Sequence, residues 1–393
     1  MGPKRVAIAT AKSSAATGPA GPDPSSLTPS RQPGARRVRV QTKTTKLVLR
    51  IVPSCHNGGD RGMAGLGWDL LRPSRILLAV LVVVCGAYVY LAVLHPRQRV
   101  PDHPYFDAPG TWVVAHRGGM ALAPENTLEA FRQAEALGVD VLEMDLRFAA
   151  DGTIVVIHDE TVDRTTNGQG RVGDMVLAEL RELDAGYRFI DDSRRFPFRS
   201  AGITVPSFSE VLRRFSDIRL NIEMKEFEPG QALALCELLQ RFDAVDRVLV
   251  SSFSHEPMAA FRAACPEVAS GATEREVVSF YLLNRLRLGS LFRSPALTLQ
   301  VPLRFRGRGL VTPDLLEPAR ESNRRVQVWT VNDEAEMGRL VGMGVQAILT
   351  DRPDQLLALL GRKRGGSCFS TSAPRCANTR PECVTKTRKG GTM

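Results

Sequence analysis

The chain has 393 residues, of which 43% are hydrophobic and 24% are charged. This length and composition fit one large domain of the α/β class with appendages, and they exclude a small disulfide scaffold, a collagen and a wholly disordered chain. The seven cysteines are scattered and show no C-x-x-C spacing, so they indicate neither a disulfide framework nor a structural zinc site.

The formal net charge of +10 is unevenly distributed along the chain. Residues 1–75 hold 13 Lys and Arg against 3 Asp and Glu, and residues 362–393 hold 8 against 1. Residues 76–361 hold the remaining 31 against 38, so the body is acidic. Binding to a phosphate backbone needs a clustered basic face, and we therefore expect no nucleic-acid binding by the folded body.

The two basic ends are predicted to be disordered tails. Residues 1–75 are rich in small residues, Pro and Arg and show no sustained apolar period. Met63 is an alternative start of translation that would remove most of this tail. Residues 362–393 combine three cysteines with eight basic residues, again without a period, and contact with anionic lipid is one role open to them.

Residues 76–94 form an uncharged run of nineteen residues with arginines on both sides. As a helix they would be ~28 Å long, close to the ~30 Å hydrocarbon core of a bilayer. We predict an uncleaved transmembrane helix, with a buried core helix as the alternative, and a linker at 95–110. Since more basic residues precede the run than follow it, the positive-inside rule places the following domain on the exoplasmic or periplasmic side.

From residue 111 to residue 361, short β-rich runs alternate with helical stretches, which is typical of a parallel α/β architecture. Nine strands are predicted: Trp112–His116, Val139–Arg147, Ile154–His158, Leu220–Met224, Val248–Ser252, Val268–Ala272, Leu297–Val301, Val326–Val331 and Ala347–Thr350. Helices fall between most of them; the helix Asn126–Leu137, for example, starts at a capping Asn126 and ends before Gly138. We expect an α/β fold, a (β/α)8 TIM barrel, and nine strands are one too many for it.

The surplus strand is explained by the second and third runs, which only a few residues around Asp151 separate. Two parallel strands need a long crossover, so these two must form an antiparallel hairpin. A turn centred near Asp151 places Glu143 opposite Asp159 and returns His158 beside Met144. The hairpin is thus predicted to rise above the barrel mouth and to bring His158 to the carboxylates.

Acidic residues gather at the ends of two predicted strands. Glu143 and Asp145 are two positions apart, so both side chains point to one face, at the end of the strand where barrel active sites are built. Glu223 and Lys225 repeat this arrangement on another strand. Buried carboxylates are costly unless they are paired or bind a cation. They indicate a hard divalent ion, Mg²⁺ or Ca²⁺; a network of carboxylates with Lys and Arg, without metal, is the alternative.

Two histidines also end strands, His116 before Arg117 and His158 before Asp159. A single histidine is more often structural, but two at neighbouring strand ends suit a general acid and a general base. Arg117 presents a fork of donors that can clamp a phosphate, and Lys225 can add a point charge. The two glycines after Arg117 permit a tight turn and close approach of a substrate.

An ordered series of motifs across about 110–355 resembles the glycerophosphodiester phosphodiesterase family. The matching motifs are His116-Arg117-Gly118, Pro124-Glu125-Asn126-Thr127, Glu143-x-Asp145, Asp151-Gly152, Val155-Val156-Ile157-His158-Asp159, Asp163-Arg164-Thr165-Thr166, Glu223-x-Lys225, Ser251-Ser252-Phe253, Val328-Trp329-Thr330-Val331-Asn332 and Leu349-Thr350-Asp351-Arg352-Pro353. One such motif would be weak, whereas the ordered set is specific. One departure is Gln346, where the family often has an acidic residue.

The resemblance implies a metal-dependent barrel that hydrolyses glycerophosphodiesters to sn-glycerol 3-phosphate and an alcohol. It implies roles for eight residues: His116 and His158 as the acid–base pair, Glu143, Asp145 and Glu223 as ligands of Mg²⁺ or Ca²⁺, Arg117 and Lys225 as phosphate-binding groups, and Trp329 as the wall of the glycerol pocket. His158 has metal binding as an alternative role. The expected partners are a small glycerophosphodiester or lysophospholipid and, through one helix, a membrane.

Two segments bear on the substrate. The insertion at 160–205, rich in Gly, Asp and Arg, is predicted to cap the barrel mouth. The apolar run at 277–292 is either an outer barrel helix or an interfacial segment through which a lysophospholipid enters from the bilayer. Three alternative functions therefore stay open: hydrolysis of lysophospholipids of the lysophospholipase D type, a sphingomyelin-directed D-type lipase on a related barrel, and a catalytically silent membrane-anchored binding protein.

Overall fold

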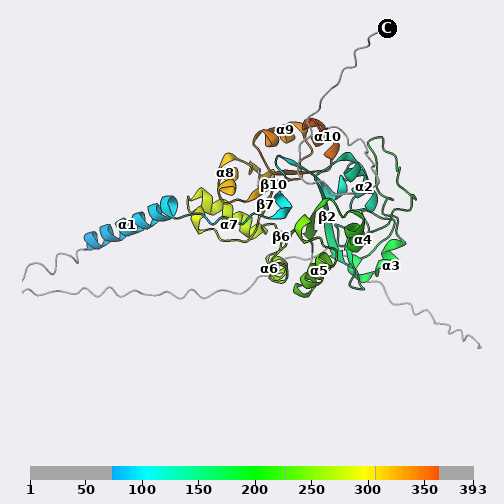
Figure 1. The fold of residues 1–393 in the computed structure, drawn as a ribbon, viewed down its shortest axis with the longest axis horizontal. Helices are drawn as coiled ribbons and strands as arrows, with labels where there is room; N and C mark the ends of the chain where they lie inside the picture. The colour runs from blue at the N-terminus through cyan, green and yellow to red at the C-terminus, as the bar shows by residue number, and fades with distance from the viewer. Residues whose placement is uncertain (1–72, 226, 306, 363–393) are drawn as a thin grey trace, which may run out of the picture. The chain divides into compact units, whose positions relative to one another are not determined.

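The computed structural model describes residues 73–225, 227–305 and 307–362 (Figure 1). The tails predicted at 1–75 and 362–393 lie outside these described residues, except for three residues of the first and one of the second.

Eight parallel strands form the centre of the fold, in the pairing order β6-β5-β4-β2-β1-β11-β10-β7. Their bounds are β1 (Trp112–Ala115), β2 (Val141–Phe148), β4 (Arg219–Met224), β5 (Val248–Ser251), β6 (Ala269–Ser270), β7 (Thr298–Pro302), β10 (Arg325–Trp329) and β11 (Ala347–Thr350). A parallel bridge between Gly271 and Thr298 links the two ends of this order. The result is a nearly closed parallel barrel, as predicted for a TIM barrel.

Helices lie around these strands (Figure 1). Their bounds are α2 (Leu128–Leu137), α4 (Phe208–Arg214), α5 (Pro229–Arg241), α6 (His255–Ala264), α7 (Glu274–Arg285), α8 (Pro313–Glu321), α9 (Glu334–Gly342) and α10 (Pro353–Leu359). A short helix, α3 (Leu177–Arg181), belongs to the insertion, and two short strands, β8 (Arg304–Phe305) and β9 (Arg308–Gly309), form a hairpin after β7.

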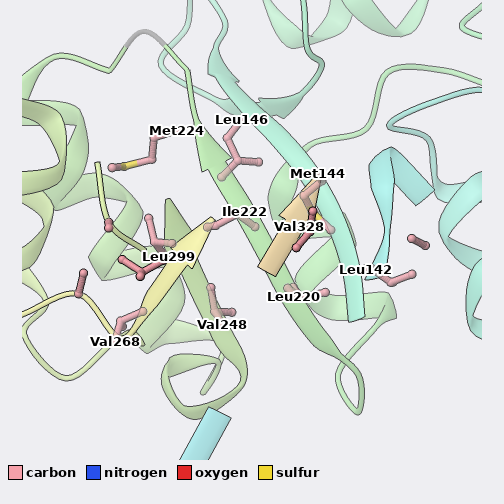
Figure 2. Packing of buried hydrophobic residues seen from close by; sticks show 14 of the residues in the cluster. Leu142, Met144, Leu146, Leu220, Ile222, Met224, Val248, Val268, Leu299 and Val328 are labelled. Carbon is pink, nitrogen blue, oxygen red and sulfur yellow. The ribbon is translucent and has the colours of Figure 1, made fainter. Parts of the chain in front are cut away.

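Alternation along the strands separates the apolar core from the barrel interior. On β2 and β4, side chains at even positions are buried in the hydrophobic core: Leu142, Met144, Leu146, Leu220, Ile222 and Met224 (Figure 2). Successive side chains on a strand point to opposite faces, so the odd positions face the other way. This alternation is why Glu143, Asp145 and Glu223 meet inside the barrel, while their neighbours pack under the helices.

The predicted hairpin is confirmed. Strand β3 (Ile154–Val156) pairs antiparallel with β2, and Phe148 lies opposite Ile154. The Ile157 N–H donates to the Asp145 carbonyl at 3.0 Å. The antiparallel pairing of β2 and β3 therefore continues with the same register up to Ile157, the residue before His158. The tight turn around Asp151 thus fixes the position of His158.

The N-cap of helix α2 lies one residue later than predicted. This N-cap is Thr127, whose hydroxyl accepts from the Ala130 N–H, and not Asn126. Asn126 has a φ of 59° and its side chain is taken by Asp145, with Nδ2 donating to Oδ2 at 2.8 Å and Oδ1 accepting from the Asp145 N–H at 3.2 Å. A residue whose side chain bonds a neighbouring strand cannot also cap the helix. Gly138 ends the helix as predicted.

The apolar run forms helix α1 (Pro73–Val89), which continues into one π-helical turn at Tyr90–Leu94. The most apolar 18-residue window of this 22-residue stretch has a mean hydropathy of 2.8, and none of that window is buried. The alternative of a buried core helix therefore does not hold. Within the predicted linker at 95–110, Tyr105 is fully buried and packs edge-on against Trp112, so part of this segment belongs to the barrel.

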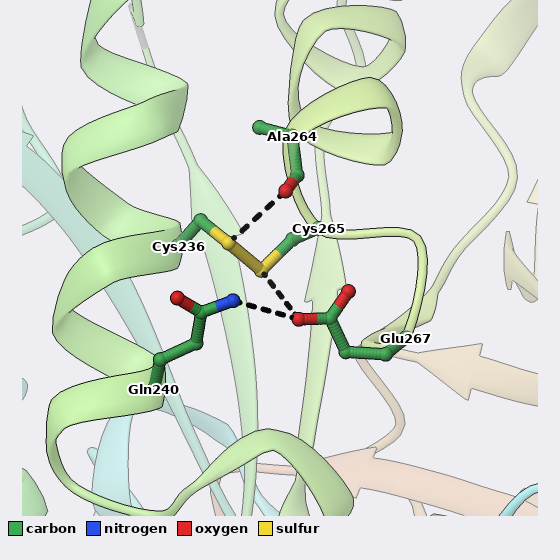
Figure 3. Close-up of a disulfide and its surroundings, with 5 residues drawn as sticks. All are labelled: Cys236, Gln240, Ala264, Cys265 and Glu267. Carbon is green, nitrogen blue, oxygen red and sulfur yellow. Dashed lines mark hydrogen bonds between the residues drawn. A yellow bond between two sulfur atoms is a disulfide. The ribbon is translucent and has the colours of Figure 1, made fainter.

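Cys236 and Cys265 form a disulfide, contrary to the expectation from cysteine spacing (Figure 3). Cys236 lies on α5 and Cys265 directly follows α6, and these helices pack against each other. The pairing joins residues 29 apart in sequence, so it depends on helix packing that no local motif encodes.

The insertion at 160–205 and the β2–β3 hairpin form a second, smaller hydrophobic core together. Val162, Val172, Leu180, Ala185 and Val205 pack with Val155 and Ile157. The insertion is thereby held on β3 and follows the position of the hairpin.

Candidate active site

A cavity of about 830 Å³ opens at the ends of the barrel strands, and all eight predicted site residues line it: His116, Arg117, Glu143, Asp145, His158, Glu223, Lys225 and Trp329. No residue of the insertion at 160–205 contributes to the wall among the residues that the structure describes, so the predicted cap stays a prediction.

Three carboxylates converge on one point of this cavity. Single oxygens of Glu143, Asp145 and Glu223 all lie within 4.8 Å of one another. Strand register explains this, because Asp145 of β2 is paired directly with Glu223 of β4. Glu143 and Asp145 are buried, so their charges are poorly hydrated.

Cationic side chains neutralise part of this negative charge. Lys225 Nζ lies 3.0 Å from Asp145 Oδ1 and 2.8 Å from Glu223 Oε1, and Arg117 Nε lies 3.3 Å from Asp145 Oδ2. Burial raises the pKa of Asp145, but the charges of Lys225 and Arg117 outweigh it and hold the pKa below its ordinary value. The carboxylate network with Lys and Arg is therefore present.

Glu143 is less well neutralised. It accepts from the Arg117 backbone N–H at 2.6 Å and forms no ion pair with Lys or Arg within the described residues. Burial raises the pKa of this carboxyl to about 7, although the charge of His116 opposes the shift. Three carboxylates thus face two full cations, and a set of hard oxygen donors with surplus negative charge fits a divalent ion such as Mg²⁺ or Ca²⁺.

His116 is oriented by a carboxylate from β11's end. Its Nδ1 lies 2.6 Å from Asp351 Oδ1, and Asn332 Nδ2 donates to Asp351 Oδ2 at 2.6 Å. Burial lowers the pKa of His116, but the charges of Glu143 and Asp351 outweigh it, so the pKa lies above the ordinary value. A carboxylate on Nδ1 leaves Nε2 as the nitrogen that can exchange a proton with a substrate.

His158 also has a carboxylate on its Nδ1, but its pKa is shifted in the opposite direction. Its Nδ1 lies 2.6 Å from Asp159 Oδ1. Burial lowers the pKa of His158, and the charge of Asp145 does not fully offset this, so the pKa lies below the ordinary value. Two histidines whose pKa values move apart suit a pair of proton-transfer groups.

The turn at Arg117 needs unusual backbone angles. Arg117 has a φ of 51°, and Gly118 and Gly119 have φ values of 84° and 85°. A Cβ at Gly118 would lie 2.7 Å from the Ala130 Cβ, and one at Gly119 would lie 3.0 Å from the Pro353 Cγ. The predicted tight turn is present, and glycine here permits close approach to α2 and α10; the close approach of a substrate stays a prediction.

Six further residues of the matched motifs support the site: Glu125, Asn126, Asp159, Arg164, Asn332 and Asp351. From the sequence, only Asn126 among them was assigned a role, as a helix cap. Four of the site residues are held by direct side-chain bonds: Arg117 by Glu125, Asp145 by Asn126, His158 by Asp159 and His116 by Asp351. Arg164 bonds Glu125 and Asp159, and Asn332 bonds Asp351. Each of these residues lies in one of the matched sequence motifs, which was the only sign of its importance in the sequence. The bonds between motifs far apart in the chain are not visible there.

One wall of the cavity is apolar. Trp329 packs edge-on against Phe253, with ring centroids 5.6 Å apart. Helix α7 adds Val277, Val278, Tyr281 and Leu282, the end of β7 adds Pro302, and β8 adds Phe305. The cavity therefore has a charged end and an apolar end.

A parallel barrel with acidic and histidine side chains gathered at the strand ends defines the class, a TIM-barrel enzyme. The chain matches the model of the glycerophosphoryl diester phosphodiesterase family over residues 116–355. It belongs to this family and is a phosphoric diester hydrolase.

Individual relatives agree with this assignment. The chain is 34% identical over 263 residues to the glycerophosphodiester phosphodiesterase of Caldanaerobacter subterraneus subsp. tengcongensis, covering 65% of this chain and 99% of the relative. It resembles the crystal structure of the Agrobacterium tumefaciens enzyme with a TM-score of 0.51 and 31% identity, over 63% and 99% of the two chains. A phosphodiesterase of Oleispira antarctica in complex with sn-glycerol-3-phosphate matches with a TM-score of 0.56 and 26% identity, over 66% and 100% of the chains.

Proposed function

We propose that this protein hydrolyses glycerophosphodiesters to sn-glycerol 3-phosphate and an alcohol, with one divalent cation and two histidines. The observation that carries the proposal is the meeting of three carboxylates and two carboxylate-bound histidines in one cavity. The sn-glycerol-3-phosphate bound in the Oleispira antarctica relative supports the choice of product.

Glu143, Asp145 and Glu223 would hold Mg²⁺ or Ca²⁺. When bound, such an ion supplies positive charge next to the non-bridging phosphate oxygens, which otherwise repel a nucleophile. Arg117 and Lys225 add positive charge to the same oxygens, and they are already held at this end of the cavity by Glu125, Asp145 and Glu223. His158 has ligation of the ion as an alternative role.

His116 and His158 carry the protons. One histidine removes the proton from the attacking hydroxyl, the glycerol 2-hydroxyl on the route through a cyclic phosphate, as the new P–O bond forms. The other protonates the leaving alcohol as its P–O bond breaks, and water then opens the ring. Such proton transfer typically contributes about 10²–10⁴-fold. Trp329 would lie against the glycerol carbons.

The test is release of glycerol 3-phosphate from glycerophosphocholine by the purified full chain, with His116→Ala and Glu223→Ala as variants. Each is expected to lose at least about 10²-fold in kcat with its melting temperature within a few degrees of wild type. Turnover retained in both variants would contradict the mechanism. A catalytically silent protein would show no turnover at all, and a sphingomyelin-directed lipase would give a cyclic or lipid monoester phosphate from sphingomyelin in ³¹P NMR.

Helix α1 is proposed as a single membrane anchor, with the barrel on the exoplasmic or periplasmic side. Its length and exposed apolar surface support the anchor. The 13 basic residues before the apolar run at 76–94 support the orientation, and so does the Cys236–Cys265 disulfide, because disulfides persist in oxidising compartments. Protease added to right-side-out membrane vesicles should digest the barrel; a barrel cleaved only after lysis would reverse the orientation.

Lysophospholipids are a second candidate substrate. They contain the same glycerol phosphodiester with one acyl chain, so the charged end of the cavity would treat both alike. The apolar wall formed by α7 is the observation that favours them.

A further inference from the structure

The apolar wall of the cavity continues outward along α7. Val278, Leu282 and Leu286 follow one another at four-residue intervals and thus lie on one face of the helix. Their exposed fractions are 40%, 53% and 58%. We call these three residues the α7 ridge. Val278 and Leu282 also line the cavity, so the ridge begins inside the site and runs out to its surface.

The first turn and the middle of this helix are fixed by contacts on its other side. Phe280, on the opposite face, is buried against Phe292, and Glu276 binds Arg262 through two hydrogen bonds of 2.9 and 3.0 Å. The ridge is therefore held outward by the packing of the other face. Phe305, 45% exposed, and Phe253, 51% exposed, add apolar surface at the rim of the same cavity.

The outer end of the ridge lies beside the end of the apolar helix α1. The Tyr88 hydroxyl donates to the Leu286 carbonyl at 3.2 Å, and the Ser290 hydroxyl donates to the Leu91 carbonyl at 2.6 Å. A helix that spans a bilayer ends at the interface, so these contacts would place Leu286 at the level of the lipid head groups. The ridge then connects the membrane surface with the charged end of the cavity.

We infer that the α7 ridge binds the single acyl chain of a lysophospholipid drawn from the bilayer that holds α1, while its phosphodiester lies among Arg117, Lys225 and the carboxylates. This inference rests on the proposed function and adds the surface that would select lysophospholipids among its candidate substrates. The glycerol of a glycerophosphodiester needs only the part of the apolar wall at Trp329, whereas each buried CH₂ of an acyl chain along the α7 ridge strengthens binding about fourfold. A diacyl lipid lacks the free glycerol hydroxyl that the cyclic route uses as nucleophile.

The experiment uses the full chain in phosphatidylcholine liposomes. The substrates are glycerophosphocholine and lysophosphatidylcholines with acyl chains of increasing length. The quantity compared is the ratio of kcat/KM for the longest lysophosphatidylcholine to kcat/KM for glycerophosphocholine. Leu282→Gln and Leu286→Gln are the test variants; Leu233→Gln on α5, where the leucine is 52% exposed, is the matched control.

For wild type, kcat/KM is expected to rise with acyl length. The ratio should fall about tenfold or more in each test variant and should stay within twofold in Leu233→Gln. A wild-type enzyme that hydrolyses glycerophosphocholine without any gain from the acyl chain, or test variants that leave the ratio unchanged, would overturn this inference alone. Absence of hydrolysis of every substrate would overturn the proposed function itself.

Discussion

Arg164 binds Glu125 through two parallel hydrogen bonds, each 2.7 Å long, from Nη1 to Oε2 and from Nη2 to Oε1. Glu125 also accepts from Arg117 Nη1 at 2.8 Å, and Arg164 Nε donates to Asp159 Oδ2 at 2.6 Å, next to the bond that Asp159 makes with His158. One guanidinium from the insertion thus connects Arg117 with His158.

Arg164 is therefore a positioning residue, and Arg164→Lys should lower activity without unfolding the barrel. Lysine cannot reproduce a planar fork with two carboxylates, so we expect kcat to fall about tenfold or more, with a smaller change in KM. Steady-state kinetics on glycerophosphocholine measure both constants. Arg171→Lys, which alters an exposed ion pair with Glu160 in the same insertion, is the control. Equal effects of the two changes would show that Arg164 acts only on the stability of the insertion.

Asp351→Asn tests the orientation of His116. The amide cannot hold an imidazolium as the carboxylate does, and in another hydrolase the equivalent change costs about 10⁴-fold in kcat. The negative charge of Asp351 raises the pKa of His116, so its removal should also shift the limb of the kcat/KM profile governed by His116 to lower pH. Asp354→Asn, three residues on and paired with Arg352, should leave profile and rate unchanged. An unshifted limb in Asp351→Asn would contradict this assignment.

Chelation should remove activity and lower stability together. Without a cation, Glu143, Asp145 and Glu223 repel one another, and a ligand bound only by the folded state at 100 times its Kd stabilises by about 2.7 kcal/mol. We expect EDTA to abolish turnover and to lower the melting temperature, and excess Mg²⁺ or Ca²⁺ to restore both. Glu143→Gln should show a smaller thermal shift on adding the ion. Full activity in excess EDTA would exclude the proposed ion site.

The local sequence pattern, with short β-rich runs, helical stretches and turn residues, was enough to predict the barrel and its hairpin. The strands follow from short β-rich runs, and the turn at Asp151 follows from the lack of room for a crossover, so the convergence of Glu143, Asp145 and His158 could be read before the structure. Strand alternation added the direction in which each carboxylate points. These features depend on neighbours within a few residues, or on rules common to all parallel barrels.

Features that depend on side-chain partners from distant segments could not be read in this way. From the sequence, Asn126 is interpreted as a helix cap, because its hydrogen bonds to Asp145 on another element cannot be predicted. The pairing of Asp351 with His116 joins residues 235 apart in the chain. The Cys236–Cys265 pairing likewise depends on how α5 packs on α6. For each of these side chains, more than one bonding partner is chemically possible, and the packing of the whole barrel determines which one lies within reach.

Glu276 should make the stability of the barrel depend on acid pH. Burial raises the pKa of this carboxyl, but the hydrogen bonds and charge of Arg262 outweigh it, so the folded-state pKa lies below the ordinary value of 4.5. A depressed folded-state pKa stabilises the fold above the unfolded-state pKa, and this contribution disappears as the pH falls through the folded-state pKa.

We therefore expect Glu276→Gln to lose about 3 kcal/mol of unfolding free energy at pH 7, because Arg262 stays buried without its carboxylate. The difference in unfolding free energy between Glu276→Gln and wild type should become smaller below about pH 4. Urea unfolding at several pH values measures both effects. Glu336→Gln, which breaks the exposed pair with Arg339 on α9, should cost less than about 0.5 kcal/mol. If Glu276→Gln differed from wild type by the same unfolding free energy at pH 7 and at pH 3.5, the lowered pKa of Glu276 would be contradicted.

Replacing Cys236 and Cys265 together by Ala should lower stability without abolishing catalysis, because the disulfide joins α5 to the end of α6 on the outside of the barrel. Closing a loop of 29 residues restricts the unfolded chain by about 3–4 kcal/mol in the chain-entropy model. Dithiothreitol should therefore lower the melting temperature of wild type and leave that of the double variant unchanged. Cys85→Ala on α1, where the thiol is free and exposed, is the control and should respond to reduction as wild type does. A double variant as stable as wild type would mean that the cross-link adds nothing that the packing of α5 on α6 does not already supply.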